Sequence, residues 1–166
     1  TSDADMYAKA KLEAEIRHRD LGNLNIFDVR VFNYVSTRQS VDDGYFFTDV
    51  VRALVNGEEF VTTSEDFVRD FAGAQNLTAL LTALLELTGN APVDLYTSKS
   101  ISKWDLLGCL TSRYGLRVCV DPSENLVSPT GVKKEYVPRL KTGSDFGYEP
   151  SGDSLSNIEQ VIQSGG

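Results

Sequence analysis

Long apolar runs are missing from this sequence of 166 residues, because polar or charged residues interrupt every stretch. No stretch approaches the ~20 apolar residues that a transmembrane helix needs, so we expect no membrane partner. Basic residues are too few for a nucleic-acid surface, since 16 Lys and Arg against 24 Asp and Glu give a net charge of −8. The first residues are acidic and polar instead of basic and then apolar. This differs from a secretory signal peptide and predicts a cytoplasmic location.

Clusters of cysteine and histidine are lacking too. The chain has one histidine, His18, and two cysteines, Cys109 and Cys119, which are too few for a recognisable zinc or iron site. Both cysteines stand inside apolar patterns, and without a secretory signal we expect them to be buried thiols. The glycines are scattered at expected helix ends and turns. They do not form the glycine-rich turn between a strand and a helix that binds a dinucleotide pyrophosphate.

What is present is an alternation of helical and strand-like segments, which predicts an α/β fold. The Ala-, Leu-, Glu- and Lys-rich start predicts a helix to about Arg19. Residues 24–32 are apolar and β-branched, which predicts a strand covered on both faces. Asn76 and Gly89 bracket a helix with an apolar stripe that we expect in the core, formed by Leu77, Leu80, Leu81, Leu84 and Leu85. We also expect helices at 50–56, 102–114 and 154–163, and strands at 59–63, 67–71, 93–96 and 116–120.

A helix followed by a buried strand is one half of a βαβ unit. The strand that should precede the first helix is not in the sequence. The chain is therefore interpreted as beginning in the middle of an α/β sheet.

The first expected helix carries Tyr7 and Lys11 four positions apart, on one face and one turn from each other. An ammonium beside a phenol favours the phenolate, which an acid/base catalyst needs in order to interconvert a hydroxyl and a carbonyl. The alternative is a surface helix on which the tyrosine packs over a lysine side chain. The charged residues from Lys9 to Arg19 predict a solvated face with ion pairs four positions apart.

Four segments, taken in order, resemble a known family. Residues 7–13, Tyr-Ala-Lys-Ala-Lys-Leu-Glu, are similar to the Tyr-x-x-x-Lys segment of the extended short-chain dehydrogenases/reductases. Residues 30–39 resemble the family's strand and loop Arg-x-Phe-Asn-x-Tyr-Gly-Pro-Arg-Gln, and residues 68–71 its Val-Arg-Asp-Phe/Tyr strand. Residues 146–155 resemble its closing segment. The order and spacing fit across nearly the whole chain, although residues 35–37, Val-Ser-Thr, stand where Tyr-Gly-Pro is usual.

The resemblance implies the tail of a Rossmann fold followed by the small α/β substrate-binding domain of this family. Residues 1–32 would be the carboxyl-terminal remnant of the dinucleotide-binding domain, and residues 33–166 the substrate-binding domain with elements that return to the Rossmann sheet. The full-length parent would hold NAD or NADP, act on a nucleotide-sugar and form a homodimer. The glycine-rich turn and the family's upstream Ser or Thr are absent. We therefore expect this chain alone to bind no dinucleotide and to be inactive.

The resemblance also implies roles for residues near the cofactor. Tyr7 would be the acid/base, and Lys11 would assist it and hydrogen-bond the nicotinamide ribose. Phe32 would lie beside them in the cofactor site. Arg38, in the loop that follows, is a less certain candidate for a site residue.

Three further residues are implied to bind substrate. Asn33 would hydrogen-bond the substrate, although an Asn at a strand end can also turn its own backbone. Arg69 would meet the nucleotide diphosphate, because a planar and always charged guanidinium suits paired phosphate oxygens. The alternative for Arg69 is an ion pair with Glu65 or Asp66. Arg139 is a candidate for a later substrate-binding arginine whose usual segment has no clean match here.

The predicted function is thus that of the carboxyl-terminal portion of an NAD(P)-dependent sugar-nucleotide epimerase or dehydratase. Two alternatives stay open. One is a reductase of a carbonyl substrate without a nucleotide, on the same scaffold. The other is a non-catalytic binding or scaffolding module that kept the fold.

Overall fold

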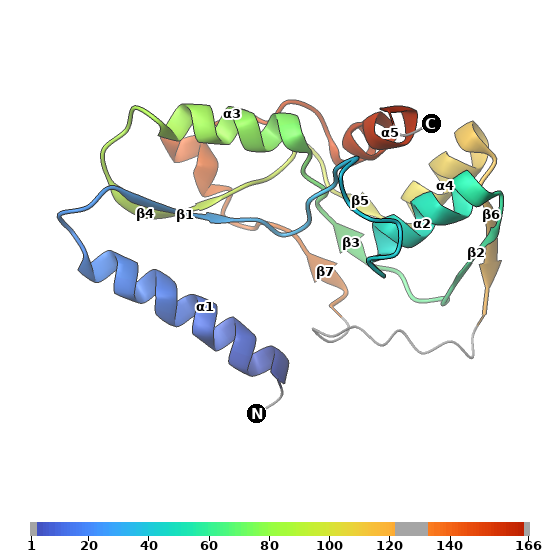
Figure 1. The fold of residues 1–166 in the computed structure, drawn as a ribbon, viewed down its shortest axis with the longest axis horizontal. Helices are drawn as coiled ribbons and strands as arrows, with labels where there is room; N and C mark the ends of the chain where they lie inside the picture. The colour runs from blue at the N-terminus through green and yellow to red at the C-terminus, as the bar shows by residue number, and fades with distance from the viewer. Residues whose placement is uncertain (1–2, 122–132, 165–166) are drawn as a thin grey trace.

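The structure is a computed structural model that describes residues 3–121 and 133–164. Helices and strands alternate along it, and the strands form three small sheets in the orders β1-β4, β2-β6 and β5-β3-β7 (Figure 1). The predicted α/β class is confirmed. The elements are α1 (Asp3–Asp20), β1 (Ile26–Arg30), α2 (Phe46–Asn56), β2 (Glu59–Thr62), β3 (Val68–Arg69), α3 (Ala74–Leu84), β4 (Asn90–Asp94), β5 (Ile101–Ser102), α4 (Lys103–Tyr114), β6 (Arg117–Val120), β7 (Glu135–Tyr136), the 3-10 helix η1 (Thr142–Phe146) and α5 (Ser154–Ser164).

Strands β1 and β4 form a parallel pair, with Ile26 opposite Asn90 and Arg30 opposite Asp94. Figure 1 shows α3 on one side of this pair and α1 on the other. Within the described residues β1 has β4 as its single sheet neighbour, so its other edge is open and its five residues are half-buried instead of covered on both faces. The first of two apolar cores lies here and comprises Ala72, Leu80, Leu84, Val93, Leu95, Tyr96 and Tyr148.

The second apolar core lies among α2, α4, α5 and the parallel pair β2-β6. Each large side chain that is fully buried there stabilises the fold by about 1.5–3 kcal/mol. In Figure 1, β3 lies in the middle of the molecule, antiparallel to β5 and parallel to β7. The second core comprises Val35, Phe47, Val50, Ala53, Phe60, Phe71, Leu106, Leu107, Leu110, Leu116 and Ile158.

The division of the chain into two domains at residue 32 stays a prediction.

Glycines end two helices where the sequence predicts it. Gly57 after α2 has a φ of 63°, and Gly115 after α4 has a φ of 73°. Glycine adopts these left-handed conformations without the steric cost that other residues incur. The start of α2 is earlier than predicted, because Tyr45 precedes the first turn and its backbone exchanges two hydrogen bonds with the hydroxyl of Thr48.

The apolar stripe of α3 was predicted too wide. Leu80 and Leu84 are buried, but Leu81 is 46% exposed and Leu85, just after the helix, is 80% exposed. Successive helical residues are rotated by ~100°, so Leu81 and Leu85 lie beside the buried stripe and not within it. The helix also begins before Asn76, whose side chain accepts a hydrogen bond from the backbone N–H of Gly73.

Candidate functional site

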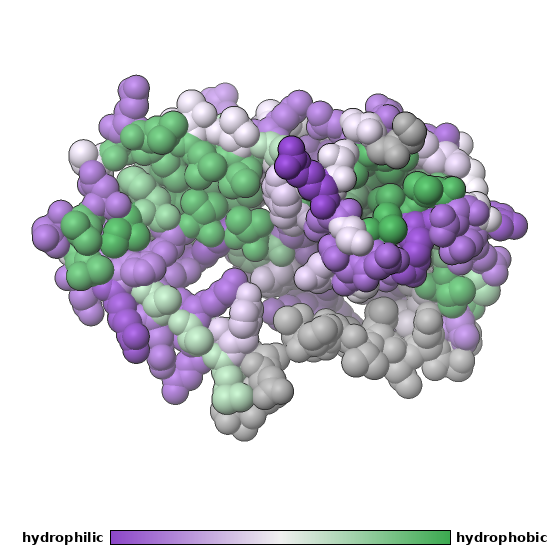
Figure 2. All heavy atoms as spheres, in the orientation of Figure 1, coloured by the Kyte–Doolittle hydropathy of each residue, from purple (hydrophilic) through white to green (hydrophobic). Residues whose placement is uncertain are grey.

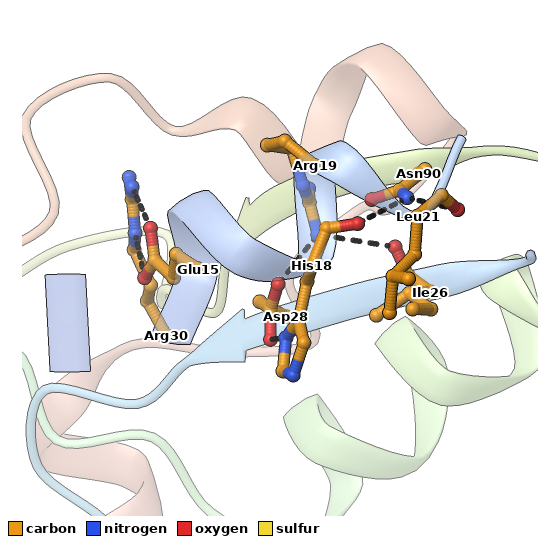
Figure 3. Close-up of polar contacts among 8 residues, drawn as sticks. All are labelled: Glu15, His18, Arg19, Leu21, Ile26, Asp28, Arg30 and Asn90. Atoms are coloured by element: carbon orange, nitrogen blue, oxygen red, sulfur yellow. Dashed lines mark hydrogen bonds and ion pairs between the residues drawn. The ribbon is translucent and has the colours of Figure 1, made fainter. Parts of the chain in front are cut away.

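Charged side chains hold α1 against β1 (Figure 3). The carboxylate of Glu15 accepts two hydrogen bonds from the Arg30 guanidinium, at 2.9 Å from Nε and 2.6 Å from Nη2. Arg30 also lies 3.6 Å from the buried carboxylate of Asp94 on β4. The hydrogen bond lowers the pKa of Glu15 and raises the pKa of Arg30. The helix is therefore attached by paired charges and not by an apolar face.

The last turn of α1 makes a second set of polar contacts (Figure 3). His18 Nδ1 lies 2.7 Å from Asp28 Oδ1, and the Arg19 guanidinium donates to the same carboxylate. Asn90 Nδ2 donates to the carbonyls of His18 and Leu21, at 2.6 and 3.1 Å. These bonds satisfy carbonyl groups that a helix end leaves without an internal partner. We refer to the whole set as the docking cluster: Glu15, His18, Arg19, Asp28, Arg30 and Asn90.

The docking cluster corrects part of the prediction for the charged residues of α1. Lys9 and Glu13 do form an exposed pair, 3.9 Å apart and four positions apart. Glu15 and Arg19, however, turn toward β1 and pair with Arg30 and Asp28. Asp28 and Arg30 on β1 carry charges beside the helix, so side chains of α1 that would otherwise face solvent form ion pairs with them.

Tyr7 and Lys11 lie on the exposed first half of α1. The Lys11 ammonium lies over the Tyr7 ring, 4.7 Å from its centroid, and Tyr7 is 57% exposed. In Figure 1, α1 and β1 run in opposite directions, so the first turns of α1 lie at the end of the sheet where β1 finishes. Phe32 and Asn33 follow from that same end. The catalytic role of Tyr7 and Lys11 stays a prediction.

The segment after β1 is attached to the segment that follows β3. Asn33 Nδ2 donates to the backbone carbonyl of Asp70 at 3.0 Å, and the Asn33 carbonyl accepts from the N–H of Ala72 at 3.0 Å. Its side chain therefore bonds a segment distant in the sequence and does not turn its own backbone. The Phe32 ring lies against the Tyr136 ring, with centroids 5.0 Å apart.

Arg69 lies half-buried on β3. Its guanidinium stacks on the Phe67 ring, 4.4 Å from the centroid, and donates to the carbonyl of Val68 at 2.9 Å. Burial lowers the pKa of Arg69. Within the part of the chain that the structure describes, the ion pair with Glu65 or Asp66 that the sequence left open does not form. The charge of Arg69 is thus without a carboxylate partner among these residues.

Strand β7 brings Tyr136 to Arg69. The two residues are register partners in the parallel β3-β7 pair, and the Lys133 ammonium lies 4.4 Å from the centroid of the Tyr136 ring. Arg139, three positions on, is exposed and pairs with Glu135 at 3.5 Å. We refer to the residues that the structure gathers as the Arg69 site: Phe32, Asn33, Phe67, Arg69 and Tyr136. Arg38 is exposed, and neither it nor Arg139 is among them.

The sequence analysis missed two residues near Arg69, Tyr136 and Lys103. Tyr136 lies in a strand of two residues, which is too short for an alternating pattern. Lys103 is fully buried at the start of α4, although lysine is among the residues least often buried. A hint was present in its neighbours, because the apolar Ile101 and Trp104 flank the Ser102-Lys103 pair.

The structure gives residues 35–37 a role in packing. Val35 is buried, and its N–H donates to the carbonyl of Ala72 at 2.9 Å. Four of the following residues line an apolar groove of about 200 Å³ with α2 and α5: Ser36, Thr37, Gln39 and Val41. The valine therefore fills core space at the position where the family usually has a tyrosine.

No group of metal-binding side chains occurs within residues 3–121 and 133–164. In the same ranges, no helix is both long and apolar enough to cross a membrane. Cys109 and Cys119 are thiols, as predicted, and they are half-buried.

Comparison with solved structures identifies the fold. UDP-glucuronic acid 4-epimerase from Bacillus cereus, in complex with UDP-glucuronic acid and NAD, aligns with a TM-score of 0.63 and 18% identity over 82% of this chain and 44% of its own. UDP-N-acetylglucosamine 4-epimerase from Bacillus cereus aligns with a TM-score of 0.73 and 15% identity, over 96% of this chain and 56% of its own. dTDP-glucose 4,6-dehydratase from Bacillus anthracis, in complex with NAD, aligns with a TM-score of 0.73 and 14% identity, over 94% of this chain and 49% of its own.

These alignments show that the chain has the fold of part of such epimerases and dehydratases. It spans about half the length of the solved chains that it matches. No family model and no curated protein matches it in sequence. The fold expected from the four motifs is confirmed.

Proposed function

We propose that the chain is the substrate-binding part, together with the catalytic helix, of an NAD(P)-dependent enzyme that epimerises or dehydrates a nucleotide-sugar. One observation supports this most directly. Phe32 after β1 contacts Tyr136, the register partner of Arg69, and Asn33 hydrogen-bonds the carbonyl of Asp70, the residue after Arg69, although these segments are far apart in the sequence. The proteins with this fold include epimerases and a dehydratase solved with UDP-sugars or NAD.

Arg69 is the proposed contact for the substrate diphosphate. Its guanidinium has no carboxylate partner among the described residues and is half-buried, which costs desolvation energy. A bound anion offsets this desolvation cost, because it accepts charge-assisted hydrogen bonds from the guanidinium. The planar guanidinium lies over the Phe67 ring, which supports one of its faces, so two N–H groups at its edge can face paired phosphate oxygens. Lys133 lies on the Tyr136 ring nearby and adds positive charge in a chain with a net charge of −8.

The residues of this chain fit only the nicotinamide end of a dinucleotide. Tyr7 and Lys11 belong to the first half of α1 and Phe32 follows β1, and Figure 1 shows the start of α1 toward the end of the sheet where β1 finishes, as a nicotinamide ribose requires. The pyrophosphate end has no such fit. Gly73 stands between β3 and α3, but a Cβ there would meet the Asn157 side chain at 3.1 Å, so that junction is already filled. NAD or NADP would accept and return hydride when bound.

In this proposal Tyr7 moves the proton. In its phenolate form the Tyr7 oxygen takes a proton from a substrate hydroxyl, and the resulting phenol gives it back in the reverse step. Lys11, one turn away, places its ammonium 4.7 Å from the centroid of the Tyr7 ring. Asn33 and Arg69 hold the substrate, which fixes its sugar relative to Tyr7.

A dinucleotide-binding half would complete the site, in the same polypeptide or as a separate one. The open edge of β1 can accept another parallel strand. Figure 2 shows apolar side chains gathered over the half of the molecule that contains α3 and β1. Exposed Leu24 and Leu81 belong to these elements and their ends, and Leu12 and Ile16 are exposed on α1. Such a surface is typical of an interface.

Titration of the chain with UDP-glucose tests the proposal. We expect binding by isothermal titration calorimetry, and a loss of about tenfold or more in affinity for Arg69→Ala, because a charged hydrogen bond contributes about 1.5–3 kcal/mol. Arg52→Ala is the matched control, because Arg52 is a half-exposed arginine on α2 paired with Asp49. Equal affinity of Arg69→Ala and the wild type would overturn the diphosphate role.

Turnover tests the catalytic helix in the full enzyme. Tyr7→Phe keeps the ring under Lys11 but removes the hydroxyl, so we expect epimerase or dehydratase activity to fall at least a hundredfold, the usual contribution of an acid/base. Undiminished turnover would remove Tyr7 from the chemistry. Turnover of a carbonyl compound without a nucleotide, unaffected by Arg69→Ala, would favour a reductase instead.

A further inference from the structure

Lys103 is a fully buried lysine that ties together both ends of a short loop. Its side-chain Nζ donates to the carbonyl of Thr63 at 2.7 Å, and its own backbone N–H donates to the carbonyl of Phe67 at 2.8 Å. One residue of α4 thus fixes the start and the end of the segment 63–67. Between these points Ser64, Glu65 and Asp66 are exposed and carry the loop through solvent.

The end of this loop carries the ring on which Arg69 lies. The Phe67 ring contacts the Arg69 guanidinium at 4.4 Å, the Lys103 ammonium at 5.9 Å and the Phe46 ring at 4.8 Å. The ring therefore has a cation at its face from β3, a second cation from α4 and a ring from α2. Any movement of the loop changes the surface on which Arg69 rests.

The surroundings of Lys103 do not require a charge for packing. Its ammonium also lies 4.3 Å from the Trp104 ring, and an apolar side chain of the same length would fill that space. Burial lowers the pKa of Lys103, although Asp66 and Glu65 act in the opposite direction. A buried cation that is costly and lacks an ion pair among the described residues is a candidate for a functional role.

A second polar group beside Lys103 is incompletely satisfied. Thr63 is 6% exposed, and within the described residues its Oγ1 is buried without a hydrogen-bond partner. Unpaired buried hydroxyls are rare, because each one costs free energy. The Thr63 end of the loop therefore depends on the Lys103 ammonium for its order.

We propose that Lys103 is a positioning residue for anion binding at Arg69: it fixes the 63–67 loop at both ends and thereby orients the Phe67 ring under the guanidinium. Lys103 has no exposed surface, so it acts through the loop and does not touch the ligand. The inference rests on the proposed diphosphate role of Arg69 and adds the residue that sets its geometry.

Chemical modification of Arg69 tests the positioning without any nucleotide. Phenylglyoxal reacts with guanidinium groups, and mass spectrometry gives the rate at each arginine. Lys103→Met keeps the length of the side chain and removes the ammonium, and we expect the rate at Arg69 to change about threefold or more. Arg139, which is exposed and pairs with Glu135, is the internal control and keeps its rate. An unchanged rate at Arg69 in a folded Lys103→Met chain overturns the proposal.

Lys103→Arg is the second variant, in case the methionine chain does not fold. It retains a charge but places it differently, because the guanidinium is larger and planar. We expect a smaller change in the rate at Arg69 and a shifted emission of Trp104, the single tryptophan of the chain. Unchanged Trp104 emission together with an unchanged rate at Arg69 overturns the proposal.

Binding of uridine diphosphate then separates positioning from general stability. We expect Lys103→Met to weaken uridine diphosphate about tenfold and uridine hardly at all, and to have no further effect when Arg69 is already alanine. Equal weakening of both ligands means a merely structural role and overturns the proposal. If the wild type binds no uridine diphosphate while Lys103→Met still alters the rate at Arg69, the nucleotide function fails and the positioning role stands.

Discussion

The carboxylate of Glu15 on α1 and the guanidinium of Arg30 on β1 are joined by two parallel hydrogen bonds. This pair, with the rest of the docking cluster, determines where α1 lies. It therefore also determines where Tyr7 and Lys11 stand relative to the end of the sheet.

Replacing Glu15 by Gln tests the pair. We expect the free energy of unfolding at pH 7 to fall by about 0.5–1 kcal/mol, as for other partly exposed ion pairs. The pKa of Glu15 is lowered by Arg30 from an ordinary value of 4.5, so this contribution is present above about pH 4.5 and lost as pH falls through the lowered pKa. Urea unfolding at pH 7 and pH 3 measures it. Glu13→Gln, in the exposed pair with Lys9, should change little, and an equal effect of the two variants would contradict the prediction.

Tyr148 should make the fold sensitive to alkali. It is buried, its hydroxyl donates to the carbonyl of Tyr96 at 2.6 Å, and burial raises its pKa to about 12. The raised pKa means that stability is fully present below pH 10 and decreases from pH 10 to 12, by about 2–3 kcal/mol in total. Denaturation at pH 8, 10 and 11.5 checks this.

Tyr148→Phe should cost about 1–2 kcal/mol at pH 8, through the lost hydrogen bond, and should flatten the alkaline part of the curve. The control is Tyr45→Phe, because Tyr45 is exposed. A curve for Tyr148→Phe that is parallel to that of the wild type up to pH 12 would refute the assignment.

Two glycines should respond to alanine with opposite signs. At Gly143 a Cβ would meet the carbonyl oxygen of Asp94 and the Tyr148 ring at 2.8 Å, so the backbone must shift and we expect a loss of about 1–3 kcal/mol. At Gly108, exposed within α4, a Cβ would have no neighbour within 4 Å, and we expect a gain of about 0.5–1 kcal/mol. Thermal unfolding of both variants tests the pair of signs, and a stable Gly143→Ala chain would show that η1 can move away from β4.

Ligand-induced thermal shifts should distinguish the two halves of the proposed enzyme. A ligand raises the melting temperature only if it binds the folded chain. We expect UDP-glucose to raise it and NAD at millimolar concentration to leave it unchanged, because the residues present fit only the nicotinamide end. A clear shift with NAD would mean that this chain contains a dinucleotide site of its own.

The sequence predicted the elements best where local chemistry decides. Gly57 and Gly115 end helices because their left-handed conformations need glycine, and this requirement is visible in a single residue. The four motifs likewise indicated the fold. The length of β3 was overestimated, since only Val68 and Arg69 of the predicted 67–71 pair with neighbouring strands.

The sequence did not predict contacts that depend on distant residues. Glu15 was assigned to solvent because its helical neighbours are charged, and only the position of Arg30 in the fold makes it part of a contact. Lys103 was passed over for the same reason, since Thr63 lies forty residues earlier. Phe32, Asn33 and Arg69 were chosen by resemblance, and their binding roles stay predictions. In the structure Phe32 contacts Tyr136, the register partner of Arg69, and Asn33 bonds the carbonyl of Asp70, the residue after Arg69.

The pairing of β1 with β4 has a consequence for the order of folding. Ile26 on β1 can pair only after Asn90 on β4 has been synthesised. The sheet can therefore form only after the whole intervening segment has left the ribosome. Within that segment α2 and β2 are neighbours along the chain and can associate early, whereas long-range parallel pairing is slow. During synthesis β1 is thus exposed without its sheet partner β4. Any polypeptide that offers a strand to β1 could bind there before β4 arrives.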